Sequence, residues 1–285
     1  MQAHFSRRSL PADLRADLSD VLTRALPLLQ ALVDVISSNG WLKPALAAME
    51  LSQMCVQGLW ADKDSPLLQV PHITAEIAEK CEAYRPDGAG GAGGAGGSDS
   101  EEEGGIETIF DLIEMEDADR RSLLGLTPAQ MGDVAHFCNR YPSVDVSFEV
   151  EDADSLTTSD TITVKIKLER EEMTEGMDEG AGLGAVLAPR YPRPKSEGWW
   201  LVIGDPSTNK LLALRRVALG RRANISLEFA APDDAGEYNF QLAFMCDSYL
   251  GCDQEYDLPL AVAQGSDDEE GDSTGSEEGD ADMEG

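Results

Sequence analysis

The chain has 285 residues and a formal charge of −32, which comes from 54 acidic and 22 basic residues. This length allows about two domains, and 42% hydrophobic residues are enough to build folded cores. No long segment is basic, so we do not expect the tight, autonomous nucleic-acid binding that needs many phosphate contacts. The five cysteines form no Cys-x-x-Cys pair or Cys/His cluster, which argues against a disulfide framework or a zinc site.

The sequence lacks the motifs of common catalytic sites. It contains no phosphate-binding loop of the type GxxxxGK[ST], no GxSxG elbow and no HExxH pair. Residues 88–93 fit GxGxxG literally, but no strand precedes them and no helix follows, so we expect no dinucleotide site. We interpret His4, His72 and His136 as ordinary surface residues. The sequence therefore predicts no enzyme activity, no cofactor and no metal, and no apolar run reaches the length of a membrane span.

Residues 1–85 are predicted to form part of a helical bundle. Apolar residues recur every three or four positions from Leu14 to Ile36, which is typical of one apolar stripe on a long amphipathic helix. Such a helix needs a partner. Pro27 lies inside the pattern and is expected to kink the helix, because proline lacks the amide donor. Further helices are expected over 44–60 and 74–83.

A linker and a helical hairpin are predicted next. Residues 86–103 are rich in Gly and Ala and then in Ser, Asp and Glu, so we predict a disordered linker. Residues 104–142 fit short helices around a turn, with Thr127 as the N-cap and Pro128 at the first helical position. This pattern resembles a helix-hairpin-helix, whose turn can present backbone amides to a phosphate. Because the segment is acidic overall, we favour a hairpin used only for packing.

From residue 143 to residue 264 the apolar period changes to two, which is typical of strands. Seven strands are expected, over 144–150, 162–168, 199–203, 210–219, 225–229, 238–245 and 255–262. This count predicts an immunoglobulin-like or fibronectin-III-like β-sandwich after the helices, and thus an α+β fold. Tyr238 is expected to bond back to the chain as a tyrosine corner. Alternation predicts Trp200 and Val202 inside the sandwich and Trp199 on the other face.

The acidic segments are predicted to be disordered. Residues 171–188 form a long acidic loop, and 265–285 form a tail with ten acidic residues and no Lys or Arg. Ser98, Ser100 and Ser266 each have an acid three residues on and are candidate sites for an acidophilic kinase. A purely solubilising charge run explains these segments equally well.

Four arginines are the candidate partner-binding residues of the sandwich: Arg215, Arg216, Arg221 and Arg222. They flank a predicted turn in an otherwise acidic region, and clustered guanidinium groups can make bidentate contacts with an acidic protein or with phosphate. The alternative is that they neutralise the acidic loop over 171–179 within the same molecule.

Several separate stretches, in one order along the chain, match a family signature. They are 2–7 (QAHFSR), 35–41 (VISSNGW), 137–142 (FCNRYP), 198–202 (GWWLV) and 244–256 (FMCDSYLGCDQEY). Together they resemble the Sec63 domain that ends the Ski2-like RNA helicases of the spliceosome, with a plant or algal character. The resemblance begins inside the domain and leaves out the helicase motor.

The resemblance implies a non-catalytic module of pre-mRNA splicing in the nucleus. Its partners would be spliceosomal proteins and the helicase motor cassettes, with weak or no direct RNA binding and no membrane contact. Two alternatives stay open. One is a fragment of the endoplasmic-reticulum translocation protein that carries the same domain, with its J domain and membrane spans upstream; the other is an independent nucleic-acid binder that uses the hairpin.

Overall fold

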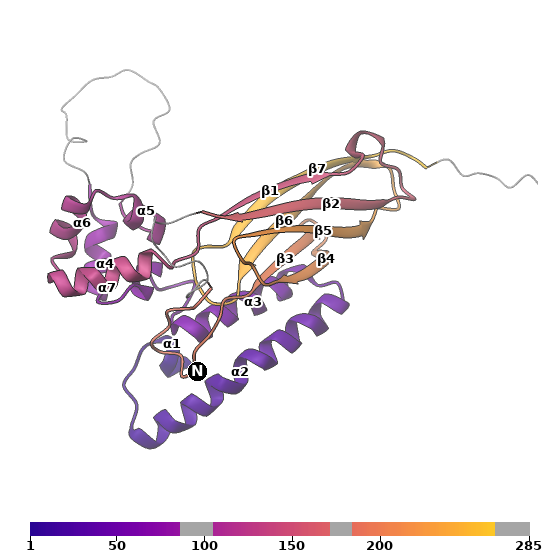
Figure 1. Cartoon of the computed structure of the whole chain (residues 1–285). Coiled ribbons are helices and arrows are strands. Elements are labelled where there is room, and N and C mark those ends of the chain that lie inside the picture. Colours follow the sequence, from indigo (N-terminus) through magenta and orange to yellow (C-terminus); the bar gives the residue numbers. More distant parts are fainter. Residues whose placement is uncertain (86–104, 172–183, 266–285) are drawn as a thin grey trace, which may run out of the picture.

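The chain folds into two stacked β-sheets with helices on one face and at one end. The computed structural model describes residues 1–85, 105–171 and 184–265. In Figure 1 the long helices α2 and α3 run beneath the sheets, and α4 to α7 form a group at one end. This mixed helix and sheet architecture confirms the α+β class.

The helices follow the predicted order. They are α1 (Gln2–Phe5), α2 (Ala12–Ser38), α3 (Leu42–Gln57), the short 3-10 helix η1 (Pro66–Gln69), α4 (Ala75–Glu82), α5 (Ile109–Glu114), α6 (Asp117–Leu124) and α7 (Pro128–Cys138). Thr127 caps α7 as expected, because its hydroxyl accepts from the Gln130 amide while the Gln130 side chain accepts from the Thr127 amide. Gly125 ends α6 in the left-handed conformation (φ 61°) that favours glycine.

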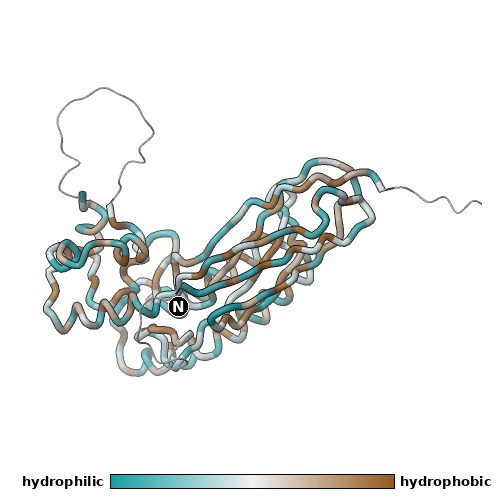
Figure 2. Tube along the Cα trace, turned by 45° about the horizontal axis from the view of Figure 1, so that its top comes forward, coloured by the Kyte–Doolittle hydropathy of each residue, from teal (hydrophilic) through white to brown (hydrophobic). Residues whose placement is uncertain are grey.

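All seven predicted strands are present. They are β1 (Val144–Val150), β2 (Thr161–Arg170), β3 (Trp199–Asp205), β4 (Lys210–Val217), β5 (Arg222–Ala230), β6 (Gly236–Cys246) and β7 (Gln254–Val262). They form two antiparallel sheets, β1-β2-β5 and β4-β3-β6-β7. Hydrophobic and hydrophilic residues follow one another along most of the strands in Figure 2, whereas β3 begins with the continuous apolar run 199–203. The Tyr238 hydroxyl donates to the Asp234 carbonyl at 2.8 Å, which confirms its predicted bond back to the chain.

The two adjacent tryptophans of β3 correct the sequence prediction. Trp199, not Trp200, points between the two sheets, where its ring stacks on Phe244 with centroids 4.3 Å apart. Trp200 and Val202 pack on the opposite face among residues of α2 and α3. Both tryptophans are only 2% exposed, because α2 and α3 cover the outer face of the four-stranded sheet. The alternation of side chains along β3 predicted that Trp199 and Trp200 point to opposite faces of the sheet. It did not predict that both faces of the sheet are covered.

Helix α2 also differs from its predicted form. Pro27 lies on its exposed side within a continuous helix, and the kink expected there stays a prediction. Its apolar residues do not make one stripe facing the core. Leu22, Leu29 and Ile36 are buried, whereas Leu28 is 68% exposed. The helix therefore has two apolar faces, and only one of them is covered by the described residues.

Candidate protein-docking site

Residues 246–254, which lie within the signature stretch 244–256, connect β6 to β7 at the place where the helices meet the sheets. We name them the junction loop. The buried glutamines of α3 bind its backbone. Gln53 donates to the Cys246 carbonyl at 2.8 Å, and Gln57 donates to the Ser248 carbonyl at 2.8 Å. Because the loop carbonyls have no strand partner there, the glutamine amides replace the missing sheet hydrogen bonds. These contacts fix α3, and with it α2, on the four-stranded sheet.

A third glutamine and a tyrosine tie the other helices to the same loop. Gln69 of η1 exchanges two hydrogen bonds with the Leu250 backbone, each at 2.9 Å. The Tyr141 hydroxyl, just after α7, donates to the same Leu250 carbonyl at 2.8 Å. Tyr141 also meets Tyr249 edge to face, with centroids 5.4 Å apart. The loop turns sharply at Gly251 (φ 85°), where a side chain would crowd the Tyr141 hydroxyl.

Two aspartates of the junction loop hold its shape. Asp253 accepts from the Cys246 amide at 2.6 Å and from the Gln53 side chain at 2.7 Å. Burial raises the pKa of Asp253 to about 6, although both donors favour its charged form. Asp247 accepts from Lys195 at 2.7 Å and from the Gly198 amide at 2.9 Å. The segment that leads into β3 is thereby attached to the loop as well.

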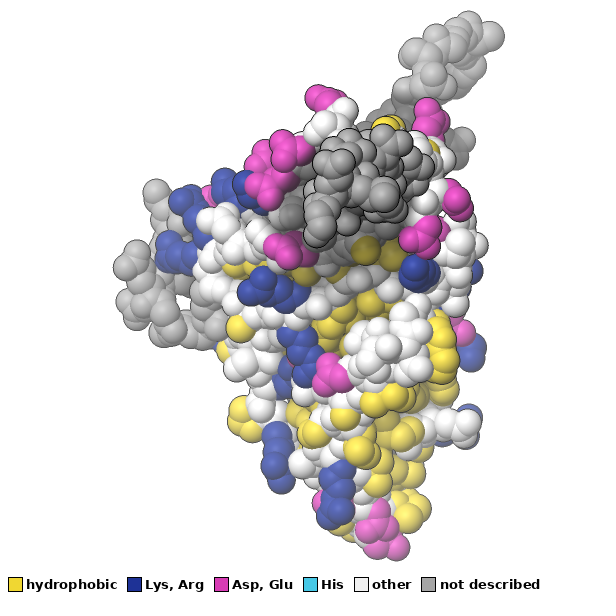
Figure 3. Space-filling model, turned by 90° about the vertical axis from the view of Figure 1, so that its right-hand side faces the viewer, with side chains coloured by type: hydrophobic (Ala, Val, Ile, Leu, Met, Phe, Trp, Pro, Cys, Tyr) yellow, Lys and Arg dark blue, Asp and Glu magenta, His cyan; other side chains and the backbone are white. Residues whose placement is uncertain are grey.

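The surface that remains uncovered is the outward side of α2. We name it the α2 outer face and define it by five residues that are 45–68% exposed: Leu14, Val21, Leu28, Leu32 and Val35. Four of them recur at intervals of seven, the spacing of a coiled-coil seam, on which a second helix can pack. Figure 3 shows hydrophobic side chains gathered over the lower part of the molecule, where α2 lies in Figure 1.

Helix α2 also bears on the expectation that no apolar run of the sequence reaches the length of a membrane span. The helix is long and apolar enough to cross a membrane by length and composition alone, a test that core helices of soluble proteins also pass. Its outer face raises its overall hydropathy. Its inner face, with five buried residues, packs against α3 and the sheet, which leaves the α2 outer face without a described partner.

The four candidate arginines do not form one free cluster. Arg216 reaches α2, where it donates to the Gln30 carbonyl at 2.6 Å and to the Asp34 carboxylate at 2.9 Å. Arg215 donates to the Ser226 carbonyl of β5 at 3.2 Å. Arg222 pairs with Glu169 across β2 and β5. The Arg221 carbonyl accepts from the Arg170 amide. Partner binding by these residues stays a prediction.

In the hairpin of α6 and α7, the side chain of Arg120, one of its few basic residues, binds backbone carbonyls of the same region. Arg120 donates to the carbonyls of Ile113 and Met115 at 3.0 and 2.5 Å, which closes the turn between α5 and α6. The Gln130 side chain accepts from the Thr127 amide and the Thr127 hydroxyl accepts from the Gln130 amide, so two amides at the start of α7 that could bind a phosphate are already bonded. The candidate phosphorylation sites Ser98, Ser100 and Ser266 lie outside the described residues.

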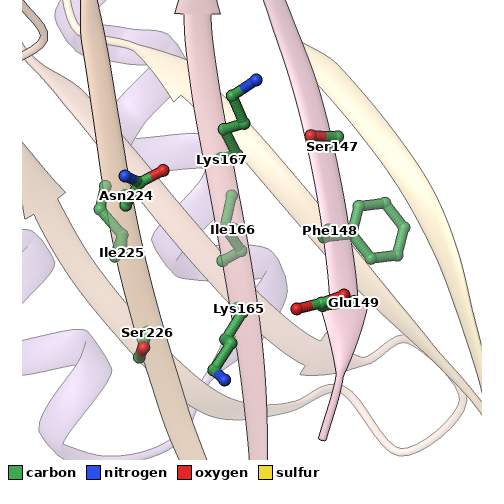
Figure 4. Close-up of a pocket in the computed structure, with 9 residues that line it drawn as sticks. All are labelled: Ser147, Phe148, Glu149, Lys165, Ile166, Lys167, Asn224, Ile225 and Ser226. Carbon is green, nitrogen blue, oxygen red and sulfur yellow. The ribbon is translucent and has the colours of Figure 1, made fainter.

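The outer face of the three-stranded sheet carries a shallow hollow of about 550 Å³. Figure 4 shows side chains from β1, β2 and β5 around it. Lys165 pairs with Glu151, and Lys167 pairs with Glu169 at 3.0 Å, so its two bases are already neutralised. Across the described ranges, no group of three or more His, Cys, Asp or Glu is arranged to hold a metal ion.

The fold and its contacts define an α+β domain in which helices, hairpin and sheets share one junction. The family model described as the Sec63 Brl domain matches residues 1–259, so the chain belongs to this family of non-catalytic domains. This match confirms the resemblance carried by the five sequence stretches.

Curated relatives narrow the family further. The chain is 47% identical over 262 residues to the DExH-box ATP-dependent RNA helicase DExH12 of Arabidopsis thaliana, covering 92% of this chain. It is 43% identical over 272 residues to the human U5 small nuclear ribonucleoprotein 200 kDa helicase, covering 95%. The chain spans only 11% of the length of either relative. It is therefore a Sec63 domain like those of spliceosomal helicases.

Among solved structures, a CARDB domain from Pyrococcus furiosus matches with a TM-score of only 0.29 and 11% identity, covering 44% of this chain and 97% of that one.

Proposed function

We propose that this chain is a non-catalytic docking and regulatory module of a spliceosomal RNA helicase, working in the nucleus in pre-mRNA splicing. The observation that carries the proposal is the α2 outer face. Its apolar side chains stand in solvent on a helix that is otherwise fixed to a rigid core. The relatives contain a far longer polypeptide, including the helicase motor that their names indicate.

The spacing of the α2 outer face indicates the kind of partner. Leu14, Val21, Leu28 and Val35 repeat every seven residues, and Leu32 lies one turn after Leu28. A coiled-coil-like seam of this type accepts an amphipathic helix whose apolar residues fill the gaps. We assign this helix to the motor-bearing part of the helicase. Its docking would couple the junction loop to the motor.

The test replaces apolar contacts by charges on the α2 outer face. Val21→Glu and Leu28→Glu together should weaken association with a recombinant motor cassette of the human relative by at least about tenfold, because two apolar side chains leave the interface. Asn224→Glu and Ser226→Glu, on the outer face of β5, add the same charge elsewhere and serve as the matched control. Equal binding by the wild type and the α2 variant, measured by calorimetry, would contradict the proposal.

The arginines of β4 and β5 are a second candidate contact of the same module. Arg215→Ala with Arg222→Ala removes two of them while sparing Arg216, which holds α2. If they dock an acidic splicing protein, its pull-down should fall while the thermal midpoint changes little. A lower midpoint with intact pull-down would assign them to the fold. The assignments of the hairpin as a helix-hairpin-helix and of the sheets as immunoglobulin-like belong to this proposal.

A further inference from the structure

A cluster of positive side chains lies beside the N-terminus of the chain. A cavity of about 460 Å³ opens there between the turn after α1, the first turns of α2 and the segment that leads into β3. In Figure 1 the N-terminus lies beside that segment. Four arginines line the cavity, namely Arg7, Arg8, Arg15 and Arg190, and its lining contains no Asp or Glu. Four of the 22 bases of a strongly acidic chain thus converge on one hollow.

The cavity is built on a fixed guanidinium group. Arg7 donates to the carbonyls of Gly58 and Leu68, each at 2.9 Å, and to that of Gln57 at 3.3 Å. These acceptors are neutral, so they hold the group in place without cancelling its charge. The Arg7 backbone lies at φ 50°, a conformation that is uncommon outside glycine. Arg7 therefore forms a preorganised floor for the cavity.

The rim of the cavity carries charge without partners. Arg8, Arg15 and Arg190 are exposed, and none makes an ion pair with a described residue. The stem of Arg190 lies against Gly58, where an added Cβ would stand 3.2 Å from its Cδ and from His4 Nε2. Three chain segments thereby contribute charges that converge on one space.

The electrostatics of the neighbouring groups agree with this geometry. Burial and the charge of Arg190 lower the pKa of Arg7 to about 10, with Asp64 acting in the opposite direction. Burial also lowers the pKa of His4, as do the charges of Arg190 and Arg7. His4, which we expected at the surface, is only 6% exposed and contacts the Cys55 carbonyl at 2.9 Å. A bound anion would offset this positive field, because the cavity lining itself contains no acid.

We propose that this cavity is a binding site for a compact anion that carries at least two phosphate groups. Guanidinium forks pair with phosphate oxygens in two parallel hydrogen bonds, which favours phosphate over a single carboxylate. The volume lies within the range of small-ligand sites and is too small for a folded partner. A single monovalent anion would leave most of the four charges unbalanced. The cavity lining shares no residue with the α2 outer face.

The test titrates the full 285-residue chain with inorganic tripolyphosphate at low salt, by calorimetry. Tripolyphosphate should bind, and Arg8→Glu with Arg190→Glu should weaken binding by at least about tenfold, because two guanidinium contacts are lost and two carboxylates that repel the anion are introduced. Arg121→Glu with Lys43→Glu, two exposed bases on α6 and α3 outside the cavity lining, make the same change in charge and should bind nearly as the wild type does. Circular dichroism and the thermal midpoint establish that the variants are folded. Should the double variant unfold, Arg15→Gln provides the same test.

Two comparison ligands decide the chemical class. Citrate carries a similar charge on carboxylates and should bind at least tenfold more weakly than tripolyphosphate. A uridine oligonucleotide distinguishes a compact phosphate site from an RNA path. The proposal is overturned if tripolyphosphate does not bind, if citrate binds equally well, if the double variant binds like the wild type, or if only the oligonucleotide binds.

Discussion

At the scale of single residues, the stability of this domain depends on polar side chains that lie where strand pairing ends. The glutamines of α3 and η1 satisfy the backbone of the junction loop, and the loop aspartates satisfy amides and a lysine. A buried polar group that loses its partner costs about 1–3 kcal/mol. Substitutions here are therefore expected to affect the fold as strongly as substitutions in the apolar core.

The two tryptophans of β3 differ in their polar contacts. Trp199 donates to the Glu197 carboxylate at 3.2 Å, whereas the Trp200 indole nitrogen is buried without a described partner. Trp199→Phe should therefore destabilise the protein by about 1–2 kcal/mol more than Trp200→Phe, because it also removes a charged hydrogen bond. Urea unfolding of both variants measures this difference. An equal or larger loss for Trp200→Phe would contradict the contacts described here.

Asp253 should make stability depend on pH. Its folded pKa of about 6 lies above the ordinary value of 3.8, so the folded state binds the proton more tightly than the unfolded chain does. Its contribution is therefore most favourable below pH 4 and is lost as the pH rises towards 6, by on the order of 2–3 kcal/mol.

Asp253→Asn removes this titration and leaves the rest of the chain unchanged. The difference in unfolding free energy between wild type and variant should thus shift in favour of the variant between pH 4 and pH 6.5, and stay constant above it. Urea unfolding at four pH values across this window provides the measurement. A difference that does not change with pH would show that Asp253 titrates normally.

At the scale of elements, α2 combines a buried face with an exposed seam. Arg216 and the inner leucines hold it on the sheet, whereas nothing in the described residues covers its outer face. The sequence predicted the helix and its need for a partner, because the three-and-four spacing is local information. It did not show which half of the stripe is covered, since Leu28 and Leu29 are equivalent in the pattern and differ only in tertiary packing.

Pro27 is a local weakness in α2. It removes one helical hydrogen bond from an exposed position in the middle of the helix. Pro27→Ala should therefore raise the unfolding free energy by about 2 kcal/mol, since the restored bond and relieved crowding outweigh the greater entropy of the unfolded chain. Asp17→Ala, also exposed on α2, is the control for helix propensity. A lower urea midpoint for Pro27→Ala would show that the helix requires a distortion at this residue.

At the scale of the whole molecule, helices, hairpin and sheets form one body around the junction loop. The order and type of nearly all elements could be predicted from periodicity, turn residues and the family resemblance. The junction could not, because Gln53 and Gln57 find their partners about 190–200 positions along the chain. One signal was available: α3 contains only Lys43 and Glu50 as charged residues, which indicates a helix covered on most sides. The proposed anion cavity was missed for the same reason, since Arg190 joins Arg7, Arg8 and Arg15 only through the fold.

The most direct test of this account is calorimetric unfolding of the full chain, alongside a variant in which Gln57 and Gln69 are both replaced by Leu. If the junction loop unites the modules, the wild type should unfold in one transition whose calorimetric and van't Hoff enthalpies agree. The double variant should unfold at a markedly lower temperature, with its helices separating from the sheets in a second transition. Two transitions in the wild type, or an unchanged single transition in the variant, would contradict the central role of the junction.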